Sequence, residues 1–188
     1  MSLDKLNQNT KDTKKVPPIR QNLTKKVATT GIFVAVGLVL SYVNYFAYFE
    51  IMGAKIFPFA HFINSIMGVL VGFSFAVMAA VSIASLRFPL GIGTIHAFHG
   101  GISGAIVVGL MAFILWKKRP KYVEIAALTE PIGTVFIGAT IAYFITPIYP
   151  LVIWWALFAA SSIPGSILGY LMLRILKRQG ISRKDYFD

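Results

Sequence analysis

Lysine and arginine residues gather at the ends of long apolar runs, and this placement points to a fold that spans a membrane. Of 18 Lys and Arg residues, seven lie in residues 1–26, four in 117–121 and five in 174–184; only Lys55 and Arg87 lie elsewhere. Basic clusters beside apolar runs are typical of multi-span membrane proteins. Charged residues are 13% of the 188 residues, about half the share in a soluble domain. The composition therefore argues against a soluble enzyme and against a nucleic-acid-binding protein.

Two absences limit the chemistry open to this chain. It contains no cysteine, which excludes disulfides, thiolate metal sites, iron–sulfur clusters and cysteine nucleophiles. It also lacks the P-loop sequence (Gly, four residues, Gly-Lys, then Ser or Thr), so it does not bind ATP through that motif. Acidic residues within the apolar runs reduce to Glu130, with Glu124 near an end. A pump or proton-coupled carrier usually needs more ionisable groups than this, and we expect no cofactor.

The longest uncharged run, Ile56–Leu86, has 31 residues and cannot be one ordinary span. As a single helix it would be about 46 Å long, against a hydrocarbon core of about 30 Å. We therefore predict a break near Gly72-Phe73-Ser74. The break also places the basic cluster 117–119 on the same side as the basic residues 1–26, which the positive-inside rule favours.

The resulting prediction is an all-α membrane protein, a compact six-transmembrane-helix bundle with cytoplasmic N and C termini. Residues 1–26 form a basic cytoplasmic tail, 27–178 the transmembrane domain, and 179–188 a second basic cytoplasmic tail. The predicted external connections are a loop at Glu50–Phe57 and a turn at Pro89–Ile95. The six predicted spans are Val27–Phe49, Pro58–Val71, Phe75–Phe88, His96–Trp116, Val123–Ile145 and Leu151–Leu176.

Four polar side chains are expected in the outer half of this bundle. His61 and Asn64 are three residues apart, as are His96 and His99, so each pair lies on one face of its helix. Aromatic walls with a few neutral donors and acceptors suit a small, flat, uncharged heterocycle. The candidate aromatic residues are Tyr45, Phe49, Phe59 and Trp154.

Other interpretations of these residues stay open at this point. His96 and His99, with His61 or Glu50 as a third ligand, could hold a metal ion, which suggests a transition-metal carrier. An intramembrane enzyme with a histidine base and Glu130 as its partner is a weaker alternative, because Glu130 is expected nearer the inner side. Glu130 is kept as a candidate binding residue whose role is either structural or functional. The aromatic residues alone would also fit an interfacial belt.

Three stretches resemble one transporter family. They are Pro58-Phe-Ala-His-Phe-Ile-Asn-Ser-Ile-Met-Gly-Val-Leu70, Gly93-Thr-Ile-His-Ala-Phe-His-Gly-Gly-Ile-Ser-Gly-Ala105 and Glu130-Pro-Ile-Gly-Thr134. In this order they resemble the ThiW family, whose members are S components of energy-coupling factor (ECF) vitamin importers. The middle stretch has His99 where the family pattern has proline, so a role for His99 is less secure than one for His61 or Asn64.

The resemblance implies a function and partners. It implies capture of hydroxyethylthiazole, a thiamine precursor, from outside a prokaryotic plasma membrane; thiamine or a related vitamin is the alternative ligand. It also implies docking onto an EcfT transmembrane subunit with two EcfA-type ATPases, which supply the energy. Gly31 and Ala35, four residues apart on the first span, correspond best to the family's small-residue docking motif.

Overall fold

The computed structural model describes residues 18–46, 49–51 and 54–186, and most of them are helical. The first helix, α2 (Pro18–Phe46), leads into a short antiparallel hairpin of β1 (Phe49–Ile51) and β2 (Ala54–Ile56). Two short helices follow, α3 (Pro58–Leu70) and α4 (Phe73–Arg87), and then α5 (His96–Lys118). The chain continues through η1 (Pro120–Thr129), η2 (Ile132–Gly138), α6 (Ala139–Ile145), α7 (Leu151–Arg178) and α8 (Arg183–Tyr186).

The predicted break in the long apolar run is present. α3 ends at Leu70, α4 begins at Phe73, and Gly72 between them has a φ of 113°, a conformation that side chains with a Cβ rarely adopt. The backbone N–H groups of Val71 and Gly72 both donate to the carbonyl of Met67, which closes the last turn of α3. The two helices are thus about 20 and 22 Å long.

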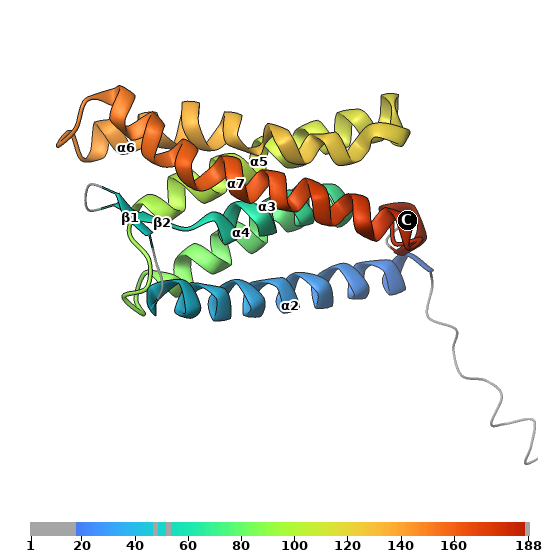
Figure 1. Ribbon diagram of the computed structural model, residues 1–188. Helices are drawn as coiled ribbons and strands as arrows, with labels where there is room; N and C mark the ends of the chain where they lie inside the picture. The colour runs from blue at the N-terminus through green and yellow to red at the C-terminus, as the bar shows by residue number, and fades with distance from the viewer. Residues whose placement is uncertain (1–17, 47–48, 52–53, 187–188) are drawn as a thin grey trace, which may run out of the picture.

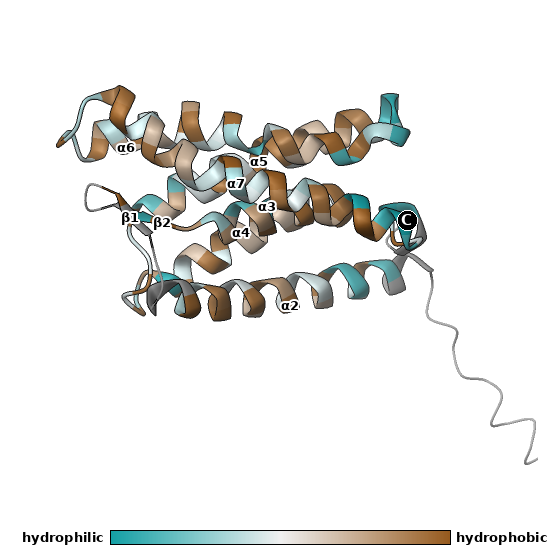
Figure 2. Ribbon diagram, viewed as in Figure 1, coloured by the Kyte–Doolittle hydropathy of each residue, from teal (hydrophilic) through white to brown (hydrophobic). Residues whose placement is uncertain are grey.

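Four helices in the described part of the chain are long and apolar enough to cross a membrane, and α3 and α4 are shorter apolar helices. The four long segments are Asn22–Val43, His96–Lys118, Pro120–Ile145 and Leu151–Arg178. Apolar residues cover the middle of the bundle, while polar residues gather at the end where α2 begins and α7 finishes (Figure 2). The chain is therefore a multi-pass, all-α membrane protein.

The short helix α3 lies at the centre of the bundle. It packs against α7, α5, α4, η1 and α2, and Ile63, Met67 and Val69 are fully buried along it. The long helices surround it, and α2 lies along one side of the bundle (Figure 1). The first turn of α3 packs against the interior of α7, since a Cβ added at Gly165 would lie 2.8 Å from His61 Cβ.

The predicted span Val123–Ile145 lies within one helical segment, Pro120–Ile145, that is long and apolar enough to cross a membrane, but this segment is not a regular α-helix. The segment is a 3₁₀ helix up to Thr129, a π-helix from Ile132 to Gly138 and an α-helix only from Ala139. Pro131 explains the change, because it has no N–H to donate to the carbonyl of Ala127, four residues earlier. The Ser65 hydroxyl on α3 bonds that carbonyl instead, at 3.3 Å. The predicted first span is also wrong at its end, because α2 finishes at Phe46 and Phe49 lies in β1. The expected loop at Glu50–Phe57 is a hairpin, since β1 and β2 pair there.

Candidate functional site

A cavity of about 400 Å³ opens among the connections at one end of the bundle. Its walls come from β2, the first turns of α3, α5 and α7, the last turn of α4, and the loops 88–95 and 146–150. In Figure 1 this is the end that carries the hairpin. The volume lies at the lower end of the range for small-molecule sites, about 300–1,000 Å³, so the cavity suits a small ligand.

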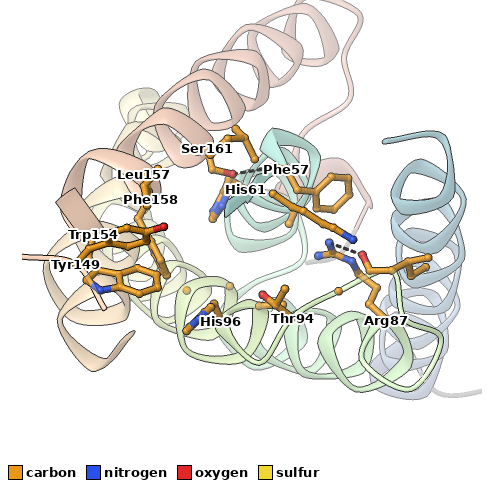
Figure 3. Close-up of a pocket in the computed structure, with 18 of the residues that line it drawn as sticks. Phe57, His61, Arg87, Thr94, His96, Tyr149, Trp154, Leu157, Phe158 and Ser161 are labelled. Atoms are coloured by element: carbon orange, nitrogen blue, oxygen red, sulfur yellow. Dashed lines mark hydrogen bonds between the residues drawn. The ribbon is translucent and has the colours of Figure 1, made fainter. Parts of the chain in front are cut away.

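One wall of the cavity is aromatic. Trp154 on α7 lies 4.8 Å from the His96 ring, 5.9 Å from the Tyr149 ring and 6.0 Å from the Phe158 ring, measured between ring centroids. Trp154 is only 3% exposed, and its indole nitrogen has no hydrogen-bond partner in the described part of the chain. Figure 3 shows Trp154 and Tyr149 together on one side of the cavity, with Arg87 and Phe57 on the other.

The two histidines of α5 form a chain of hydrogen bonds that fixes their tautomers. His99 Nδ1 lies 2.8 Å from the carbonyl oxygen of Gly138, and a carbonyl can only accept, so Nδ1 carries the proton. With neutral rings, His99 Nε2 then accepts from His96 Nδ1, 3.1 Å away. His96 lines the cavity, and this order of donors leaves its Nε2 as an acceptor for a group in the cavity.

A buried polar cluster lies below His61, which also lines the cavity. The carboxylate oxygen Oε1 of Glu130 accepts from His61 Nδ1 at 2.7 Å and from Asn64 Nδ2 at 3.1 Å. The hydroxyl of Thr134 lies 3.0 Å from the same oxygen, and Asn64 also donates to the carbonyl of Gly101 at 2.8 Å. Glu130 is fully buried. We call Glu130, His61, Asn64 and Thr134 the carboxylate cluster.

The carboxylate cluster corrects the expectation that Glu130 lies apart from the histidines. Glu130 and His61 are in direct contact, because α3 packs against the segment that leads into Glu130 and Pro131. The cluster also joins the three stretches on which the family resemblance rests: His61 and Asn64 come from the first, Gly101 from the second, Glu130 and Thr134 from the third.

The structure divides the candidate binding residues into two groups. His61, His96 and Trp154 line the cavity. Asn64, His99 and Glu130 lie behind it and hold the lining residues in place, and Phe59 packs edge-on against Phe57, which does line it. The side chains of Tyr45, Phe49 and Glu50 lie outside the described residues.

Several lining residues were not singled out from the sequence. Phe158 lies four residues after Trp154, and Ser161 lies seven residues after Trp154. The helical repeat along α7 therefore places both on the same face as Trp154 and would have predicted them as lining residues. Thr134, in the carboxylate cluster, likewise follows Glu130 by four. Ser161 accepts a hydrogen bond from the backbone N–H of Phe57 at 3.0 Å, which ties the start of α3 to α7.

The three histidines that a metal carrier would need do not converge. His96 contacts His99, whereas His61 contacts Glu130. Among the described residues no group of three or more His, Cys, Asp or Glu could hold a metal ion. The metal-carrier alternative therefore has no site in the part of the chain that the structure describes.

Comparison with known families decides what kind of transporter this is. A family model described as thiamine-precursor transporter protein (ThiW) matches residues 27–179. The chain belongs to the ThiW family. Searches of curated proteins and of solved structures gave no match. Within this ThiW protein, the matched region covers both the cavity and the carboxylate cluster, from α2 to the end of α7.

Proposed function

We propose that this ThiW-family protein captures a thiamine precursor in the cavity beside Trp154 for uptake into the cell, and that the precursor contains the thiazole ring. The aromatic wall carries this proposal. A flat ring can stack against Trp154, Tyr149 or Phe158, and the cavity volume of about 400 Å³ fits a ligand of that size. In 4-methyl-5-(2-hydroxyethyl)thiazole the hydroxyl is a donor, which His96 Nε2 can accept.

A binding titration tests the ligand and its place. We expect purified protein to bind hydroxyethylthiazole, and Trp154→Phe to weaken binding about tenfold, since the larger indole surface and its N–H are lost. Tryptophan fluorescence and calorimetry measure the affinity. The control is Trp116→Phe, at the far end of α5, which should leave the affinity unchanged. No affinity for hydroxyethylthiazole, its ring-substituted relatives or thiamine would reject the substrate assignment.

We further propose that the chain is the S component of an ECF importer and crosses the membrane six times, with the cavity facing outward. The basic residues of α2, of 117–121 and of the end of α7 all lie at the end of the bundle opposite the cavity (Figure 2), and the positive-inside rule assigns that end to the cytoplasm. An EcfT transmembrane subunit and two EcfA-type ATPases would then supply the energy. The membrane would be a prokaryotic plasma membrane.

The exposed face of α2 is the surface we propose for docking the EcfT subunit. Gly31 and Ala35 are exposed, and a Cβ added at Gly31 would meet nothing within 4 Å. Small residues let a second helix approach closely. This face is therefore open to a partner helix.

Gly31→Leu should separate ligand binding from partner docking. We expect ligand affinity and thermal stability to stay near wild type, because surface substitutions change stability by about 0.5 kcal/mol or less. Copurification with the EcfT subunit and its ATPases should be lost, because the leucine side chain holds the two backbones apart. The control is Ile32→Phe on the neighbouring face of the same helix. Unchanged copurification of Gly31→Leu would show that the partner docks elsewhere.

A further inference from the structure

The side of the cavity opposite Trp154 holds a buried arginine. Arg87, the last residue of α4, is only 7% exposed and lines the cavity. A guanidinium group carries five N–H donors and always a positive charge. Buried charges in proteins are normally paired with an opposite charge, because desolvation without a partner is costly. The Arg87 guanidinium in the cavity wall therefore needs an anionic partner.

The described residues supply little of what Arg87 needs. Its Nη2 donates to the carbonyl oxygen of Ile92 at 3.3 Å, a long hydrogen bond. Its Nε is buried and has no partner in the described part of the chain. Lys55 is the other charged residue that lines the cavity, and no Asp or Glu lines it within the described ranges. Glu130 is not available, because it lies behind His61 in the carboxylate cluster.

The surroundings hold the guanidinium in place without using up its donors. The Arg87 Cζ lies 4.1 Å from the centre of the Phe57 ring, a cation–π contact. Such stacking uses the face of the guanidinium and leaves the N–H groups at its edge free. The loop packs tightly on the other side, since a Cβ added at Gly93 would lie 2.9 Å from Arg87 Cβ. Arg87 is thus fixed with donors left unpaired, which a carboxylate or phosphate could satisfy.

We propose that the cavity takes a thiazole that bears an anionic group, with Arg87 as the anion subsite. This inference rests on the function proposed above and narrows its substrate class. The ring lies against the aromatic wall, and a carboxylate or phosphate ester reaches across the cavity to Arg87. Thr94 also lines the cavity and lies between His96 and Arg87 (Figure 3), where its hydroxyl supplies a further donor.

The two possible ligands differ in the group that they offer to His96, on the side of the cavity opposite Arg87. A carboxylate on the thiazole ring leaves the hydroxyethyl group free to donate to His96 Nε2, so both ends of the cavity are satisfied. A phosphate ester of the hydroxyl places the anion on the side chain instead. Either ligand is charged and so crosses lipid far more slowly than neutral hydroxyethylthiazole, which is a reason for a dedicated importer.

The test compares three ligands with one ring: neutral hydroxyethylthiazole, its phosphate ester and its ring 2-carboxylate. We expect wild-type protein to bind at least one anion about tenfold or more tightly than the neutral compound, as charge-assisted bidentate bonds are about twice as strong as neutral ones. Arg87→Gln should abolish this preference while changing the affinity for the neutral ligand by less than about threefold. Arg174→Gln, at the far end of α7, is the matched control.

Thr94→Val provides a second variant in case Arg87→Gln folds poorly. It removes one donor without removing charge, and we expect the preference for the anion to fall about threefold to tenfold. The tighter of the two anions identifies the group that the subsite recognises. If the neutral compound binds at least as tightly as both anions, or both variants weaken all three ligands equally, the anion subsite is wrong and the proposed function stands. If none of the three binds, the anion subsite is wrong, and if thiamine also fails to bind, the proposed function is wrong as well.

Discussion

Glu130→Ala is expected to cause a large loss of stability. Removal of the carboxylate leaves the His61 ring nitrogen and the Asn64 amide buried without their shared acceptor. Each buried donor left without an acceptor costs about 1–3 kcal/mol. For the two donors the loss is about 2–6 kcal/mol, and for a chain of this size that corresponds to a fall of about 4 °C or more in Tm. Thermal unfolding in detergent, followed by tryptophan fluorescence, measures the change.

One further variant at Glu130 and one control elsewhere show whether the second acceptor oxygen or the bulk of the Glu130 side chain is needed. Glu130→Gln keeps the size of the side chain and one acceptor oxygen, so we expect a smaller loss, about 1–3 kcal/mol. Glu124→Gln is the control on the same segment: Glu124 forms an ion pair at 2.8 Å with Lys177, whose side chain is exposed, and a pair screened by solvent in this way contributes about 1 kcal/mol or less. A Glu130→Ala protein that melts like the Glu124→Gln protein would show that the carboxylate cluster does not stabilise the fold.

Gly104→Ala should lower the stability of the protein, and Gly101→Ala should not, although both residues lie on α5. A Cβ added at Gly104 would occupy the space of Glu130 Oε1 and Thr134 Oγ1, whereas a Cβ at Gly101 would meet nothing within 4 Å. Overpacking of a core costs about 1–3 kcal/mol. Gly→Ala in an open helical position instead stabilises by up to about 1 kcal/mol. The expected result is a lower Tm for Gly104→Ala and an unchanged or higher Tm for Gly101→Ala.

Ligand binding provides an independent check of the Gly104→Ala variant. In Gly104→Ala, displacement of the Glu130 carboxylate by the added methyl group would also release His61, which lines the cavity, so we expect the affinity for the thiazole ligand to fall about tenfold. Binding is measured below the Tm of the variant, so that unfolded protein does not contribute. A Gly104→Ala protein with wild-type Tm and affinity would mean that the carboxylate cluster tolerates displacement by a methyl group.

The candidate site was only partly accessible to sequence reasoning. Helical spacing paired His61 with Asn64 and His96 with His99, and the structure shows the first pair sharing the Glu130 carboxylate and the second pair in direct contact. Spacing could not show that His61 and Glu130, 69 residues apart, form a hydrogen bond. Nor could it show that Arg87 turns into the cavity instead of toward the membrane surface, since that depends on how α4 and the loop 88–95 pack.

The sequence by itself determined that this chain is an all-α membrane protein, which stretches form most of its apolar helices, and where the long uncharged run breaks. These properties are local, because they depend on the transfer of apolar side chains into lipid, on the length of a helix and on the backbone of Gly72. The tertiary structure decided which side chains meet. The position of α3 against α7 and the rotation of each helix arise from packing between segments distant in the chain, which no local pattern encodes.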